Sequence, residues 1–360
     1  MHKYIPIIKR PTIGKLFDDL ASKNKTVKSS TVPYLELGHS KIEDDIKLFA
    51  SMNHYDKYFA DYFYSRGPKS NDDDKWNVRS NEDLITLTSK FPRSVVAGSS
   101  VFDKSKVIPV VSRPNEYDDS NELIQHYVSL IPKYRTFGFN QVGLRLEHNF
   151  KDMKNPTDQF KEAVLKLKDN DFVFIDCKTS SLSINKFEAF ENSINSNVSS
   201  IKSIKKGINV AILNPEFDLK DVTDTKIKRH NHGKSLMRNK EVYGYGNYVS
   251  EREQDLNGPN PVPFSISYYD FKTGNTIRFD SKVSIKETLK LFENDEYAKG
   301  LVKEHSKYCS SCEELENCLE DPDEGDKKLR NNRRKGQIRK EHFINSIVID
   351  EMTQGTPSTY

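Results

Sequence analysis

The sequence predicts an α/β fold, namely a (β/α)8 TIM-barrel-like domain followed by a C-terminal extension with a β-hairpin, helices and a cysteine cluster. Two observations predict the barrel. Short runs rich in β-branched and aromatic residues alternate with stretches of helical periodicity along residues 1–250. Seven or eight such units favour parallel strands, which close naturally into a barrel. An open doubly wound sheet is the alternative, but no glycine-rich phosphate-binding turn follows the first strand.

The elements of the barrel follow one another in chain order. We expect strands at residues 4–8, 32–37, 58–64, 107–113, 142–147, 172–178, 207–215 and 242–248. The glycines of the last run also fit a loop. Apolar residues at helical spacing predict helices at 14–22, 42–52, 81–91, 121–131, 156–168 and 185–204.

The character of the chain changes after residue 250. A glycine- and proline-rich joint precedes two strand-like runs, 264–270 and 275–279, and the Lys272-Thr-Gly-Asn275 sequence between them is typical of a hairpin turn. A helix at 285–292, the cysteine cluster, a charged loop and a closing apolar helix near 342–352 follow. We therefore expect a barrel domain at 1–250 and an extension at 251–360.

Composition restricts the class of protein only broadly. Of the 360 residues, 35% are hydrophobic and 30% charged, and the net charge of +3 makes any nucleic-acid contact a matter of local patches. No apolar run approaches the roughly 20 residues of a membrane helix, and the apolar stretch at the N-terminus is too short for a signal peptide. We expect a cytoplasmic protein without membrane contact, in which four cysteines suit a reducing compartment.

Charged residues in two expected strands mark the first candidate site. Arg145 and Glu147 share one face of the first strand, and Asp176 and Lys178 share one face of the second. At a barrel mouth these residues would meet a second group, Arg113, Tyr245 and Asn247. The set fits a structural ion network in which Arg145 pairs with Glu147 and Asp176 with Lys178. It also fits a polar ligand site, where Arg113 and Arg145 bind a phosphate or carboxylate, or a catalytic site.

The catalytic interpretation is a metal-dependent nuclease or phosphodiesterase. Asp176-Cys-Lys178 fits the acidic-x-Lys core of a restriction-type nuclease, in which a carboxylate holds Mg²⁺ and the lysine stabilises charge on the attacked phosphate. Glu147 would contribute a further carboxylate. The upstream metal-binding acid has only weak candidates, Asp152 and Asp171 among them.

The second candidate site is a metal centre in the extension. Cys309, Cys312 and Cys318, with His305 one helical turn ahead, have a spacing that can reach one structural zinc ion. An iron–sulfur cluster with a distant fourth cysteine and free, packed thiols are the alternatives. Cys177, the remaining cysteine, is expected in the barrel core.

A third candidate is a basic tract. Residues 313–326 hold eight acids, and residues 327–340 hold eight basic residues. Adjacent runs of opposite sign predict a mutually screening surface. Alternatively, Arg330, Arg333, Arg334 and Lys335 contact nucleic-acid phosphate or an acidic partner.

Several short motifs, taken at their spacing, resemble the Beta protein family, which is found in phages, phage satellites and prophages. They are Tyr4-Ile-Pro-Ile-Ile-Lys9, Val32-Pro-Tyr-Leu-Glu-Leu37, Val107-Ile-Pro-Val-Val-Ser-Arg113, Val142-Gly-Leu-Arg-Leu-Glu147, Val173-Phe-Ile-Asp176 and Tyr243-Gly-Tyr-Gly-Asn-Tyr248. The terminal Glu341-His-Phe-Ile-Asn345 resembles the closing histidine-containing helix of that family.

The resemblance implies a barrel-like fold and a role in antiphage defence, or in the control of a toxic partner encoded by an adjacent gene, without established catalytic activity. Two positions depart from the family. Asn247 stands where the family has an acid, and a single His342 beside Phe343 stands where it has two histidines. Our leading hypothesis is a defence component that binds a partner protein or a phosphate-bearing ligand at the barrel mouth, and the nuclease is the rival.

Overall fold

The computed structural model describes residues 2–9, 11–23, 25–37, 42–61, 95–96, 99–100, 104–113, 120–148, 156–177, 181–219, 224, 226–248 and 264–351. The chain divides into two compact units. Unit 1 comprises Met1–Lys178, Glu188–Pro215 and Ser235–Asn247, and unit 2 comprises Thr179–Phe187, Glu216–Lys234 and Tyr248–Tyr360.

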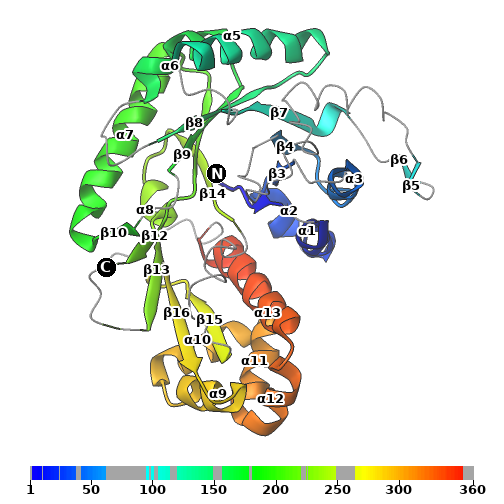
Figure 1. The fold of residues 1–360 in the computed structure, drawn as a ribbon, viewed down its shortest axis with the longest axis vertical. Helices are drawn as coiled ribbons and strands as arrows, with labels where there is room; N and C mark the ends of the chain where they lie inside the picture. The colour runs from blue at the N-terminus through cyan, green and yellow to red at the C-terminus, as the bar shows by residue number, and fades with distance from the viewer. Residues whose placement is uncertain are drawn as a thin grey trace, which may run out of the picture. The chain divides into compact units, whose positions relative to one another are not determined.

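Unit 1 contains a parallel sheet whose strand order is β1-β14-β11-β9-β8-β7-β4-β3-β2 (Figure 1). Its strands are β1 (Lys3–Tyr4), β2 (Ile7–Ile8), β3 (Tyr34–Glu36), β4 (Tyr58–Asp61), β7 (Val107–Val111), β8 (Gly143–Glu147), β9 (Phe172–Asp176), β11 (Asn209–Leu213) and β14 (Val242–Gly246). The outermost strands β1 and β2 are consecutive halves of one extended segment. The sheet is therefore a ring of eight strand positions.

Backbone hydrogen bonds on both sides of this segment close the ring. The Ile5 N–H donates to the Tyr245 carbonyl at 2.8 Å, and on the other side the Tyr34 N–H donates to the Pro6 carbonyl at 2.9 Å. Pro6 has no N–H to donate to a neighbouring strand, so it interrupts the segment between β1 and β2. The expected (β/α)8 TIM-barrel-like fold is thus confirmed.

The glycines of β14 are required by the close approach of the first strand. A Cβ atom at Gly244 would lie 2.1 Å from the Lys3 carbonyl oxygen, and one at Gly246 would lie 2.0 Å from the Ile5 carbonyl oxygen. No side chain fits at that distance. The sequence left this segment open between strand and loop, and the structure shows a strand.

Helices follow the strands of unit 1 as expected, and their buried faces cover a sheet with apolar residues on both sides. They are α1 (Pro11–Lys23), α2 (Lys25–Ser30), α3 (Ile42–Ala50), α5 (Ser120–Thr136), α6 (Pro156–Lys166), α7 (Phe187–Ile204) and α8 (Gly233–Leu236). The helix expected at 81–91 lies outside the described residues. A short turn η1 (Lys104–Lys106) and the paired strands β5 (Val95–Val96) and β6 (Ser99–Ser100) precede β7.

Unit 2 combines a five-stranded sheet with a helical layer, and it is larger than the tail at 251–360. Excursions after β9 and β11 add three strands to the hairpin, giving the order β10-β12-β13-β16-β15. The strands are β10 (Ser181–Leu182), β12 (Glu216–Leu219), β13 (Ile227–Asn231), β15 (Phe264–Asp270) and β16 (Asn275–Ser281). The expected hairpin is present, and Gly274 takes the left-handed conformation (φ 76°) that its turn requires.

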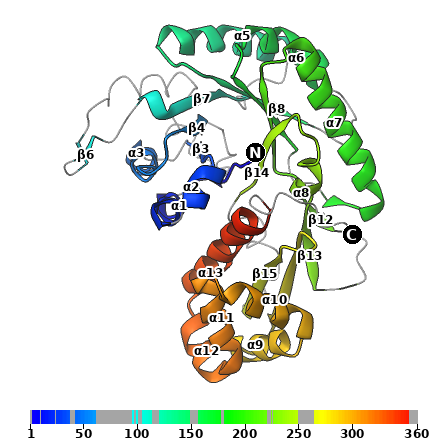
Figure 2. The same cartoon turned by 180° about the vertical axis from the view of Figure 1, so that it is seen from behind.

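The helices of unit 2 are α9 (Ile285–Glu293), α10 (Glu296–Ser306), α11 (Ser310–Glu320), α12 (Pro322–Leu329) and α13 (Asn332–Asn345), and α13 continues as a π-helix, Ser346–Glu351 (Figure 2). The expectation of a charged loop here was wrong. Asp321 caps α12 by accepting hydrogen bonds from the Asp323 and Glu324 N–H groups, and Pro322 occupies its first turn. Leu315, Leu319 and Leu329 bury the apolar faces of these charged helices.

Candidate functional site

The first candidate site lies at the barrel mouth, where each of the eight strand positions ends in a polar side chain. In chain order these are Lys9, Glu36, Asp61, Ser112, Glu147, Asp176, Asn214 and Asn247. The carboxyl ends of the strands form the face on which barrel proteins usually build their sites. Arg145 of β8, two residues before Glu147, reaches into the same layer.

Arg145 is almost completely buried, with 1% of its surface exposed, and its donors all meet carboxylates. Its Nε and Nη2 donate to Asp176 at 3.0 and 2.6 Å, and its Nη1 donates to Glu36 at 2.9 Å and Asp61 at 3.0 Å. β4 and β7 separate β3 from β8 in the sheet, so the Arg145–Glu36 contact must cross the barrel interior. We call Arg145, Glu36, Asp61 and Asp176 the arginine layer.

Neutral donors complete the arginine layer. Ser112 and the Tyr34 hydroxyl donate to Asp61 at 2.5 and 2.7 Å, and Asn214 donates to the second oxygen of Asp176 at 2.7 Å. Burial raises the pKa of Asp61, and the charge of Arg145 opposes that shift.

Aromatic rings pack beneath the charges. Tyr34, Phe59 and Phe174 stand two residues before the acids of their strands, and Phe174 meets the other two rings edge-on at 5.1 and 4.8 Å. The layer above them therefore rests on a packed floor. Glu36 also pairs at 3.0 Å with Lys9, whose side chain is 44% exposed.

The expected convergence of charges occurs, but with different partners. Arg145 pairs with Asp176 rather than with Glu147, and Glu147 lies 3.6 Å from Arg113. Residues two apart on one strand are separated by about 6.6 Å, whereas Glu147 and Asp176 are direct neighbours across two strands, so contacts between strands are shorter. Lys178 lies outside the described residues.

Tyr245 and Asn247, expected to bind a ligand, are both buried between the first and last strands. The Tyr4 hydroxyl donates to Asn247 Oδ1 at 2.6 Å, and the rings of Tyr4 and Tyr245 lie 5.7 Å apart. The structure therefore places both residues in the packing that closes the barrel.

This arrangement bears on both chemical interpretations of the mouth. Asp176 accepts hydrogen bonds on both oxygens, which disfavours it as a Mg²⁺ ligand. Arg145 has its donors on carboxylates, which disfavours it as a phosphate clamp. Sequence reasoning missed Glu36 and Asp61, although each ends an otherwise apolar strand, which is the signal that singled out Asp176.

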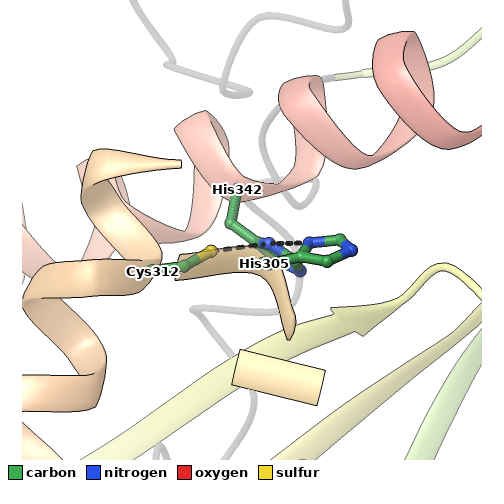
Figure 3. Close-up of side chains that lie close together, drawn as sticks. All are labelled: His305, Cys312 and His342. Atoms are coloured by element: carbon green, nitrogen blue, oxygen red, sulfur yellow. Dashed lines mark hydrogen bonds between the residues drawn. The ribbon is translucent and has the colours of Figure 1, made fainter. Parts of the chain in front are cut away.

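The second candidate site is a buried cluster of metal-ligating side chains in unit 2. His305 at the end of α10, Cys312 of α11 and His342 of α13 bring one ligand atom each within 4.8 Å of one another (Figure 3). His342 Nδ1 lies 3.1 Å from Cys312 Sγ and 3.2 Å from His305 Nδ1. We call these three residues the His/Cys cluster. Its imidazole and thiol groups could hold a metal ion.

The contacts of His342 suit a metal ligand. Its Nε2 donates to the Tyr269 carbonyl at 2.7 Å, which leaves Nδ1 as the acceptor that faces the cluster. Its ring stacks on Tyr268 with centroids 3.7 Å apart. Burial lowers the pKa of His342, so the ring stays neutral, which is the form that binds metals.

Of the expected cysteine ligands, Cys309 lies beside the cluster and Cys318 does not belong to it. A hydrogen bond with Cys312, and another with His342, lower the pKa of Cys309 to about 4 despite its burial. Cys318 instead packs against Gly325 of α12. The six residues from Cys312 to Cys318 turn the helix by about 600°, which points the two thiols to different sides. Sequence reasoning used spacing alone and missed His342.

The basic tract is largely engaged by neighbouring acids. Arg330 pairs with Asp326, and Arg334 forms two hydrogen bonds with Glu314. Burial lowers the pKa of Lys335. The side chain of Arg333 lies outside the described part of the chain.

Comparisons with known proteins add little to these sites. No protein-family profile and no curated protein sequence matches the chain. A solved structure that it resembles is the biosynthetic arginine decarboxylase of Campylobacter jejuni, at 10% identity and a TM-score of 0.37. The similarity covers 97% of this chain and 56% of the decarboxylase chain, so this chain spans little more than half of that protein. No helix in the described ranges has the length and apolar character to cross a membrane.

Proposed function

We propose that this protein is a binding component of a bacterial antiphage-defence or toxin-control system, acting in the cytoplasm. It binds a protein encoded by an adjacent gene through an anionic group, a carboxylate or a phosphate, received at the barrel mouth. The setting in defence rests on the resemblance to the Beta protein family. The arginine layer favours a binding role over a catalytic one, because its three carboxylates are already engaged by Arg145.

The rim pair Arg113–Glu147 is the part of the mouth best suited to receive a partner. Its side chains are 37% and 20% exposed and lie 3.6 Å apart. A solvated pair of this kind contributes at most about 1 kcal/mol, so an incoming anionic group can replace Glu147 beside Arg113 at small cost. If Arg145 instead turned to bind the anion, Glu36, Asp61 and Asp176 would lose the cation that they share.

The nuclease or phosphodiesterase is the rival function. It requires Asp176, with Glu147 and Lys178, to act on a Mg²⁺-bound phosphate. The hydrogen bonds on both oxygens of Asp176 favour the binding role instead.

For the second site, we propose that the ion held by the His/Cys cluster is zinc in a structural role. Zinc accepts imidazole nitrogen and thiolate together, whereas Mg²⁺ prefers oxygen. The four cysteines of the described structure are unpaired by disulfides, so the thiol of Cys312 is available for coordination.

Arg113→Ala tests the binding role in cells that carry this gene and its neighbour. We expect the variant to lose copurification with the neighbouring protein and protection against phage, because the anionic group of that protein no longer meets the Arg113 guanidinium. Lys57→Ala is the matched control, since this exposed lysine bonds Gln141 at the opposite ends of the strands. Full binding by Arg113→Ala would contradict the proposal.

Treating the partner with phosphatase separates the two anions, because only a phosphate-dependent complex is lost. The rival is tested with purified protein, DNA or RNA, and Mg²⁺. We expect no cleavage, whereas cleavage that Asp176→Asn abolishes would establish the nuclease.

A further inference from the structure

The His/Cys cluster gathers electron-pair donors without a permanent cation among them. The proton on His342 Nε2 is committed to the Tyr269 carbonyl, so the Nδ1 lone pair faces a second imidazole nitrogen and a thiol at 3.2 and 3.1 Å. His305, Cys312 and His342 are all completely buried, so water cannot solvate these groups from outside. In the absence of an ion these groups hydrogen-bond to one another, and a metal ion that displaces the thiol proton of Cys312 would bind all three groups at once.

The spacing of the ligand atoms fits a tetrahedral ion. With Zn–N near 2.05 Å and Zn–S near 2.3 Å, two nitrogens are about 3.3 Å apart, and a nitrogen and a sulfur about 3.6 Å apart. The observed separations of 3.2 and 3.1 Å are slightly shorter. For these two pairs, ion binding requires a separation of only a few tenths of an ångström, and the third pair, His305 and Cys312, lies within 4.8 Å.

Cys309 lies beside this group, although its Sγ is not among the atoms that lie within 4.8 Å of one another, so its side chain must turn to reach an ion held there. It is the N-cap residue of α11, and the Asn345 amide of α13 donates to its Sγ at 3.5 Å, which places this thiol between the two helices. The Cys309 N–H donates to the His305 carbonyl at 3.0 Å, and the Cys312 N–H donates to the Cys309 carbonyl at 2.9 Å. This continuous turn brings the three side chains to one side, as in metal sites with the Cys-x2-Cys spacing.

We propose that His305, Cys309, Cys312 and His342 form a closed four-ligand metal site that fastens α13 to α10 and α11. The proposal rests on the zinc assignment above and extends it, because it fixes the ligands and the role of the site. All four residues are at most 1% exposed, so there is no open position for water or substrate, as a catalytic zinc would need. His342 thus takes the position expected for Cys318.

Cobalt substitution tests the ligand set, because the intensity of thiolate-to-cobalt charge transfer reports the number of bound thiolates. The full-length protein is stripped of metal and titrated with Co²⁺. We expect one tetrahedral Co²⁺ with two thiolates, and roughly half the charge-transfer intensity in Cys309→Ser. Cys318→Ser is the matched control, a buried cysteine in the same helix as Cys312, and should match the wild type. His342→Gln removes a ligand, so it should weaken binding by more than the roughly 10- to 100-fold that loss of an outer-shell partner costs.

His342→Cys gives a signal that does not depend on losing a ligand, since a third thiolate should raise the charge-transfer intensity to roughly 1.5 times that of the wild type. Unchanged intensity in Cys309→Ser, or a loss in Cys318→Ser, would overturn the ligand set while leaving a metal site in place. No Co²⁺ or Zn²⁺ binding by the wild-type protein would overturn the zinc proposal and this inference together.

Discussion

The arginine layer and the His/Cys cluster both bury polar groups, but they neutralise them differently. In unit 1, Arg145 brings a fixed positive charge to Glu36, Asp61 and Asp176. In unit 2, the cluster consists of two imidazoles and one thiol, and no lysine or arginine belongs to it. The arginine layer carries a counter-charge within the fold, whereas the cluster could take its positive charge from a metal ion.

The supporting elements differ as well. The arginine layer stands on strands that a closed ring of backbone hydrogen bonds holds in register. The cluster joins α10, α11 and α13, which are separate helices held by side-chain packing. We therefore expect the first site to be insensitive to chelators and the second to depend on its ion.

Removing the shared cation of the arginine layer should have the largest effect. Arg145→Met removes the cation shared by three buried carboxylates, of which Glu36 keeps Lys9, and we expect a loss of about 3–5 kcal/mol in the free energy of unfolding. Urea denaturation measures it. Combining Arg145→Met with Asp61→Asn and Asp176→Asn should recover part of the loss, because the buried charge disappears. A single variant as stable as the wild type would show that the layer is not the charge balance we describe.

Removing the ion should come next. A site held at a free zinc concentration of 100 times its dissociation constant contributes about 2.7 kcal/mol, which a chelator abolishes. Hydrogen exchange should show lost protection in α10, α11 and α13, while the β8 and β9 amides keep theirs. An equal loss of hydrogen-exchange protection in both units, or no loss in either unit, would contradict the contrast between the sites.

A smaller effect is expected from the titration of Asp61. Burial raises the pKa of Asp61 above its usual 3.8, so the folded protein holds this proton more tightly than the unfolded chain. The resulting stabilisation is complete below pH 3.8 and is lost as the pH rises through the folded pKa. Asp61→Asn should flatten this fall in stability, as urea midpoints across the pH range would show. An unaltered pH profile would mean that Asp61 stays ionised in the folded layer.

The smallest effect concerns the surface. Arg334→Ala removes the ion pair with Glu314 between α13 and α11, and we expect a loss of at most about 1 kcal/mol at low salt. The loss should shrink at high salt. If Arg334→Ala instead weakens DNA binding with a reduced salt slope, the basic tract contacts phosphate as well.

The strands of the barrel could be predicted because they are short apolar runs, most of them followed by a stretch of clear helical periodicity. The charge on Arg145 and Asp176 also marked the layer, since a buried strand seldom carries charge without a partner. Their partners could not be predicted. Glu36 and Asp61 come from strands far away in the chain, and only ring closure brings them across the interior to Arg145.

The candidate metal site could be predicted only in part, for a related reason. His305, Cys309 and Cys312 are close in sequence, so local spacing suffices to group them. His342 joins them only because α13 folds back along α11 and β15, which no local pattern encodes. The division of the chain into two units could not be predicted from local patterns either. β10, β12 and β13 lie between barrel elements in the sequence but pair within unit 2.

Metal content measured by native mass spectrometry tests the contrast most directly. The protein is purified without chelator, and the wild type is compared with Cys312→Ser, His342→Gln and Cys318→Ser. We predict one zinc ion in the wild type and in Cys318→Ser, and none or only traces in the other two, with unit 1 folded in all four. A wild-type chain without metal, or full occupancy in both Cys312→Ser and His342→Gln, would contradict the account.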